Sequence, residues 1–95
     1  MKFGAIRVLI ITTKPLTMAS KHQTKTIKKY EALGWFVINL IKTNKNGIPD
    51  LLCLKSGETP LFIECKEKTD TVKPLQQYMI DLLNSLGFNA MVDKC

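Results

Sequence analysis

The sequence predicts a single α/β domain in which a mixed sheet is flanked by helices. Two stretches carry apolar residues at helical spacing, three β-rich runs lie between them, and glycine or proline marks most boundaries. Ninety-five residues suffice for one modest hydrophobic core but not for two independent folding units. The predicted order is an extra N-terminal strand, then helix, three strands, helix and strand.

The N-terminal extension, residues 1–17, is predicted to be a strand followed by a linker, with the domain proper at 18–95. The stretch Phe3–Ile11 is rich in β-branched residues, but it is interrupted by Arg7 and too short to span a bilayer. No small-residue cleavage site follows it. We therefore expect a cytoplasmic protein without a membrane partner.

The first helix is predicted over residues 20–33, where Gln23, Ile27 and Tyr30 recur at helical spacing among lysines and Gly34 follows. The next run, residues 35–41, is almost entirely apolar and predicts a strand buried on both faces. A polar loop over residues 42–47 ends it.

The last two of the three β-rich runs between the helices are expected to pair as a hairpin. They cover residues 51–54 and 61–66, and Ser56-Gly57 between them favours a tight turn. The second helix is predicted from Pro74, with Gly87 at its end, and residues 88–92 return as the last strand. We expect the apolar face of this helix to carry Leu75, Met79, Leu82, Leu83 and Leu86.

The charge balance favours a polyanionic partner. Lys and Arg number 14 against 8 acidic residues, giving a net charge of +6. The alternative is that surplus lysines only keep the surface soluble.

The three cysteines, Cys53, Cys65 and Cys95, have no partner spacing for zinc or a disulfide framework, and the first two are expected in the core.

The register of the predicted hairpin determines whether two acids meet. If the turn is the three residues 56–58, Lys55 faces Thr59 and, further along both strands, Asp50 faces Glu64. Directly opposed residues share a face with β-carbons about 5 Å apart, and like charges there are destabilising without compensation. A turn one residue longer would place the two carboxylates on opposite faces.

A divalent cation is the natural compensation for two opposed carboxylates, because Mg²⁺ and Mn²⁺ prefer hard oxygen ligands. The backbone carbonyl of Cys65 is a candidate third ligand, and Lys66 projects to the same face as Glu64. This set suits phosphodiester hydrolysis, which needs a metal-activated water and a cation beside the developing charge. The alternative is an ordinary charged strand end, since a lone Glu-x-Lys is common.

The order of motifs then makes a resemblance specific. Gly47-Ile48-Pro49-Asp50-Leu51-Leu52, Phe62-Ile63-Glu64-Cys65-Lys66, Leu75-Gln76 and Leu86-Gly87-Phe88 together resemble the VRR-NUC family of the PD-(D/E)XK nucleases. The resemblance covers about residues 20–92. It implies a restriction-endonuclease-like core of helix, three strands, helix and strand, in a bacterial or phage-encoded enzyme.

The resemblance also implies Mg²⁺- or Mn²⁺-dependent cleavage of DNA, often of junctions, flaps or other branched structures. Asp50 and Glu64 would bind metal, Lys66 would assist the attacking water, and Gln76 would support the site from the second helix. Gln23 would occupy a polar position of the first helix. Family members often carry an acid early in that helix, whereas here the first acid is Glu31.

Further basic and polar residues are candidates for DNA contact. Lys21 and Lys25 on the first helix would bind duplex backbone, and Lys45 and Asn46 lie in the loop before Asp50. A solvated helix face and a solvated loop are the alternatives. The single histidine, His22, has too few partners for a metal role.

Two rival functions differ from a nuclease: a nuclease-fold module that binds nucleic acid with weak or no cleavage, and a structural protein. Symmetric cutting of branched DNA needs two active sites, so we expect a homodimer, with the Phe3–Ile11 segment as a candidate pairing edge.

Overall fold

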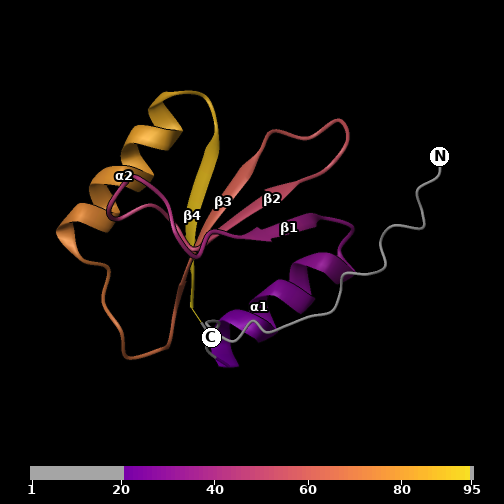
Figure 1. Cartoon of the computed structure of the whole chain (residues 1–95), viewed down its shortest axis with the longest axis horizontal. Helices are drawn as coiled ribbons and strands as arrows, with labels where there is room; N and C mark the ends of the chain where they lie inside the picture. Colours follow the sequence, from indigo (N-terminus) through magenta and orange to yellow (C-terminus); the bar gives the residue numbers. More distant parts are fainter. Residues whose placement is uncertain (1–20, 95) are drawn as a thin grey trace.

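The computed structural model describes residues 21–94, and these form a four-stranded sheet between two helices (Figure 1). The helices are α1 (Lys21–Ala32) and α2 (Pro74–Ser85); the strands are β1 (Phe36–Asn39), β2 (Leu51–Leu54), β3 (Leu61–Lys66) and β4 (Asn89–Lys94). This confirms the predicted α/β class and the order from the first helix onward. The predicted strand in residues 1–17 lies outside the described residues.

The sheet is mixed, with strands in the order β1-β2-β3-β4. β1 pairs with β2 and β2 with β3 in antiparallel fashion, whereas β4 runs parallel to β3. The parallel pair requires a crossover, and α2 provides it. β3 therefore lies in the interior of the sheet, hydrogen-bonded on both sides.

The hydrophobic core lies between α1 and one face of the sheet. Tyr30 packs there against Leu51, Cys53, Ile63 and Cys65, all of which are buried. Because side chains alternate along a strand, the residues between these ones project to the opposite face, where α2 lies. Glu64 and Lys66 are on that second face. The core positions predicted for the two cysteines are confirmed.

Two details of packing differ from the sequence-based expectation. Among residues 21–94, β1 is an edge strand and Phe36 is 68% exposed, so the prediction of burial on both faces was wrong. On α2 the buried residues are Met79, Ile80 and Leu83, whereas Leu75, Leu82 and Leu86 are exposed. The physical reason is that α2 packs mainly on β4 and leaves part of the sheet uncovered.

Two glycines fit positions that a side chain would disturb. Gly57 takes a positive φ of 79° in the β2–β3 turn, where the amide of Glu58 donates to the carbonyl of Lys55 at 3.0 Å. Gly47 has the same φ and lies against α2, so that an added Cβ would be 2.7 Å from the Leu75 Cγ. The loop before β2 is thereby held close to the first turn of α2.

No helix within residues 21–94 has the length and apolar character needed to cross a membrane.

Candidate active site

The β2–β3 hairpin brings the two predicted acids together. Leu51 faces Ile63 and Leu52 faces Phe62, which is the register expected from a three-residue turn. Asp50 and Glu64 are the next residues outward on the two strands. The Asp50 Oδ2 also accepts a hydrogen bond from the Cys65 amide at 2.9 Å, which fixes this carboxylate beside β3.

Glu64 is a nearly buried carboxyl group, 3% exposed. Burial and the neighbouring Asp50 charge raise its pKa to about 7, and the Lys66 ammonium opposes that rise. A hydrogen bond between the Glu64 and Asp50 side chains also favours the protonated form. Near neutral pH the pair therefore binds a proton readily, and a divalent cation would compete with that proton for the same oxygens.

Lys66 provides the positive charge of the site. Its Nζ lies 3.6 Å from the Glu64 Oε2, and only 12% of its side chain is exposed. Burial of the stem leaves few orientations for the ammonium group, which is held on the same sheet face as Glu64. A cation fixed in this way costs little reorganisation when negative charge develops nearby.

Gln76 links the site to the start of α2. Its Oε1 accepts a hydrogen bond from the Lys73 amide at 2.9 Å, and its Nε2 donates to the Glu64 Oε2 at 3.2 Å. The first bond orients the amide so that its NH₂ group must face the carboxylate. Gln76 is half-buried, because its side chain contacts Glu64.

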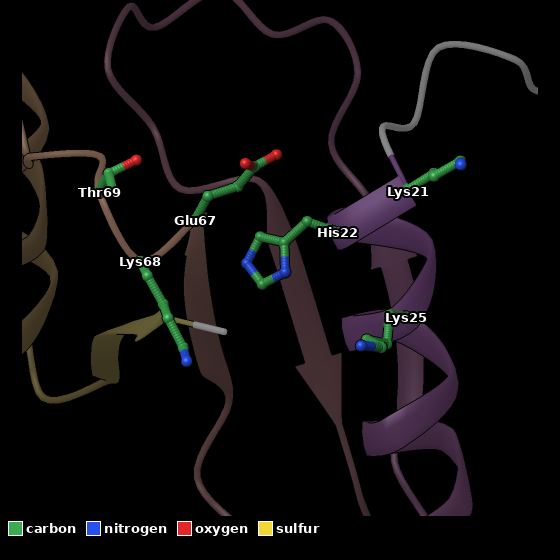
Figure 2. Close-up of a pocket in the computed structure, with 6 residues that line it drawn as sticks. All are labelled: Lys21, His22, Lys25, Glu67, Lys68 and Thr69. Atoms are coloured by element: carbon green, nitrogen blue, oxygen red, sulfur yellow. The ribbon is translucent and has the colours of Figure 1, made fainter.

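The predicted nucleic-acid contacts divide between two places. Gln23 lines a hollow of about 250 Å³ together with Asp50 and residues 39–41, so α1 does reach the acidic site. Lys21 and Lys25 instead line a cavity of about 500 Å³ beyond the end of β3 (Figure 2). Lys45 and Asn46 are exposed in the loop before Asp50.

The second cavity contains three residues that the sequence did not single out. Besides Lys21, Lys25 and His22, it is lined by Glu67, Lys68 and Thr69. The only sequence signal for these three was that they directly follow Lys66, at the end of a strand that carries the proposed chemistry. His22 is 7% exposed and its Nε2 lies 3.4 Å from the Asp93 carbonyl oxygen.

A buried network joins α1 to β4 and was also not foreseen. The Asp93 carboxylate accepts hydrogen bonds from the Tyr30 hydroxyl at 2.9 Å and the Lys29 ammonium at 2.8 Å. Burial alone would raise the pKa of Asp93, but these two hydrogen bonds, together with the positive charge of Lys29, outweigh it and hold the pKa below its usual value. The network thus fixes α1, and with it Gln23, against the sheet.

The donor set at the acids suits a hard cation. Within residues 21–94 no three side chains of His, Cys, Asp or Glu gather at one point. Asp50 and Glu64 supply two carboxylates, the main-chain carbonyl of Cys65 is the predicted third oxygen, and Mg²⁺ commonly completes such a set with water and substrate phosphate. Burial, together with the neighbouring Asp50 charge, raises the pKa of Glu64, and a bound cation would favour its ionised form. The residues therefore fit a divalent metal.

Two comparisons bear on this arrangement. The model of the VRR-NUC domain family matches residues 13–94. A solved structure described as a VRR_NUC domain is similar to this chain, with 28% identity and a TM-score of 0.64. The similarity covers 74% of this chain and 76% of the other. No curated protein matches the sequence.

Proposed function

The chain belongs to the VRR-NUC domain family and has its nuclease-type fold, and from this premise we propose that it is a metal-dependent DNA endonuclease. The observation that carries the proposal is the pairing of Asp50 with the buried Glu64 beside the Lys66 ammonium. Two acids and a fixed cation on one sheet face are what phosphodiester hydrolysis requires.

Asp50, Glu64 and the Cys65 carbonyl are the proposed ligands of Mg²⁺ or Mn²⁺. When bound, such an ion supplies Lewis acidity toward a phosphate and lowers the pKa of a water molecule. The hydrogen bond from the Cys65 amide to the Asp50 carboxylate orients that ligand before any metal arrives. Gln76 does the same for Glu64.

Lys66 acts on the reacting groups in this proposal. Its ammonium would stabilise the negative charge that develops on the phosphate and donate a hydrogen bond to the oxygen of the attacking water. The Glu64 carboxylate, 3.6 Å away, keeps the ammonium pointed into the site. Gln76 is a positioning residue, because its side-chain hydrogen bonds are with Glu64 and Lys73.

The proposed substrate is DNA with a junction, a flap or another branch. The net charge of +6 attracts the phosphate backbone. Lys21 and Lys25 line the cavity beyond the end of β3, and Lys45 and Asn46 lie exposed in the loop before Asp50. Gln23 approaches the acids at Asp50. A homodimer would present two such sites to one branched molecule.

The test is incubation of the purified chain with labelled linear, flapped and four-way DNA in Mg²⁺, in Mn²⁺ and in chelator. We expect cleavage only with metal and faster cleavage of the branched substrates. Asp50→Ala and Lys66→Ala should each lower kcat by a factor on the order of 10² or more, because each removes a group that acts at the phosphate. Asp81→Ala is the matched control, since Asp81 lies exposed on α2.

A chain that binds all three DNA forms but leaves them intact in either metal would instead support the rival binding module. One observation favours that rival: the first turn of α1 has no acid, and Gln23 stands beside Asp50. Gln23→Glu would then supply a third carboxylate. A gain of cleavage in this variant, from an inactive parent, would assign the rival function to the natural sequence.

A further inference from the structure

The cavity beyond the end of β3 has the composition of an anion site. It lies between the first turn of α1 and the segment that follows Lys66, and its lining includes three lysines: Lys21, Lys25 and Lys68. Within the described part of the chain, the ion pairs are Lys29 with Asp93 and Lys66 with Glu64, so none of these three lysines is neutralised there. Their charge is available to a ligand.

Figure 2 shows how the charged groups face the cavity. Lys25 extends from α1 toward the opposite wall, Lys68 extends from that wall, and the Lys21 side chain points outward at the rim. The one acid on the lining is Glu67, so three lysines against one glutamate leave a net charge of +2. Thr69 adds a hydroxyl, which can donate a hydrogen bond to an anion.

The size of the cavity fits part of a polymer better than a small ion. Its volume of about 500 Å³ is in the range of roughly 300–1,000 Å³ found for ligand pockets, enough for a nucleotide with its phosphate. His22 forms a firm back wall, being 7% exposed and close to the Asp93 backbone. A hollow of this size and charge can accommodate one phosphate.

The position of the cavity ties it to the acidic site. Lys68 is four residues beyond Glu64, and four residues of extended chain span at most about 14 Å. A DNA strand advances about 3.4 Å per nucleotide, so this distance corresponds to at most about four nucleotides. A strand that binds at Glu64 and Lys66 and continues around the end of β3 toward α1 can therefore place a nearby phosphate between Lys25 and Lys68.

We propose that this cavity is a phosphate subsite, in which Lys25 and Lys68 together hold one phosphate of the DNA strand within about four nucleotides of the scissile bond. The inference rests on the proposed nuclease function, whose scissile bond lies at Glu64 and Lys66. The subsite sets where the strand lies relative to those residues. Lys21 contributes charge from the rim.

The decisive experiment places a single uncharged methylphosphonate at each position within six nucleotides of the cut. With the parent chain we expect one position, up to about four nucleotides from the cut, to slow cleavage about tenfold. In the double variant Lys25→Ala/Lys68→Ala, cleavage should be slow for all substrates, and the sensitivity at that position should disappear. The double variant Lys25→Arg/Lys68→Arg should keep the sensitivity to the methylphosphonate at that position, because both positive charges remain.

Lys28→Ala is the matched control. Lys28 lies on α1 one turn beyond Lys25 but is not part of this cavity. The variant should keep the same sensitive position as the parent chain. Thermal melting of all variants checks that each is folded. A double alanine variant that is folded and retains the parental pattern would overturn the subsite.

A binding measurement in chelator tests the inference without cleavage. For duplex DNA, log K falls with log salt with a slope of about 0.9 per phosphate neutralised. If both lysines hold one phosphate, the double alanine variant should lower the slope by about 0.9, and two separate phosphates would lower it by about 1.8. An unchanged slope, or a loss of about 1.8, counts against a shared phosphate.

The two readouts separate failure of the subsite from failure of the nuclease proposal. If the parent chain cuts no DNA, the salt slope still shows whether the cavity binds phosphate. Oligonucleotides with a 5′-phosphate or a 5′-hydroxyl identify the source of that phosphate. A dependence on the terminal group assigns the subsite to strand ends, and a dependence on an internal methylphosphonate assigns it to the continuous backbone.

Discussion

At the scale of single residues, the candidate site is a buried carboxyl group in an unfavourable environment. Glu64 is held beside Asp50 with a pKa of about 7, while Gln76 and Lys66 support its ionised form. The hairpin register could be predicted from the turn length alone, and it placed the two acids together. The Gln76 contact could not be derived from spacing, because it depends on how α2 crosses over the sheet.

The first prediction concerns stability at Glu64. The pKa of Glu64 is near 4.5 in the unfolded chain and about 7 in the folded chain. Because the unfolded chain loses this proton first, the free energy of unfolding falls as pH rises between these two values. In chelator, Glu64→Gln should therefore stabilise the fold by an amount on the order of 2 kcal/mol at pH 8 and by little at pH 4. The same variant should lose nuclease activity.

Urea unfolding at both pH values measures this difference. Glu58→Gln, a change in the exposed β2–β3 turn, is the control and should have no effect at either pH. Equal unfolding free energies for Glu64→Gln and the parent chain at pH 8 would show that Glu64 is not strained by its surroundings.

At the scale of secondary-structure elements, local signals predicted the helices and the hairpin, and long-range packing decided the rest. The bounds of α1 and α2 follow from apolar spacing and from Pro74 at the first turn. The exposure of Phe36 and Leu86 depends on which part of the sheet α2 covers, and no local pattern encodes this. The Asp93 network likewise joins residues more than 60 positions apart.

The second prediction concerns this tie between α1 and β4. Because the pKa of Asp93 is held below its usual value, its ionised form stabilises the fold above the unfolded pKa of 3.8, and the effect is lost as pH falls. Asp93→Asn should cost about 1 kcal/mol at pH 7, and the difference from the parent should shrink in acid. Urea unfolding from pH 3 to 7 measures it, with Asp81→Asn as the control. A constant difference across this range would contradict the assignment.

The third prediction separates backbone strain from contact at two glycines of equal φ. Gly57→Ala meets no atom within 4 Å, so its cost should be only the left-handed backbone, about 1–2 kcal/mol. Gly47→Ala has the same cost of a left-handed backbone and also forces the Leu75 side chain away. We expect Gly47→Ala to be the more destabilising change.

Leu75→Ala is the test of that contact. It should recover part of the stability lost in Gly47→Ala, with the remainder set by the Leu75 backbone, whose oxygen an added Cβ would approach to 3.2 Å. In Gly57→Ala the same substitution should recover nothing. Equal effects of Leu75→Ala in both backgrounds would show that the loop before β2 is not held by α2.

At the scale of the whole molecule, a small domain leaves much apolar surface uncovered. Phe36, Tyr78 and Leu86 are each more than 60% exposed. Charge and motif order predicted the family and the nuclease-type fold, which are global properties of the sequence. Assembly is a different matter, since it depends on complementary surfaces that no residue pattern specifies.

The fourth prediction is the homodimer proposed above. Exposed apolar side chains in these numbers favour association in water. Light scattering at micromolar concentration should give twice the mass of one chain, and dilution should lower it. A single-chain mass throughout that range would contradict the dimer, and the two cuts on a branched substrate would then be independent events.

The rate at which the buried cysteines react with an alkylating reagent reports how often the β2–β3 hairpin opens. Cys65 lies between Glu64 and Lys66 on β3 but faces the other side, and Cys53 lies on β2. Burial raises their pKa values to about 12 and about 11, so an alkylating reagent meets almost no thiolate in the closed fold. Labelling must await opening of the hairpin. The labelling rate therefore measures the local opening of the two strands next to the acids. Bound metal or DNA should lower this rate.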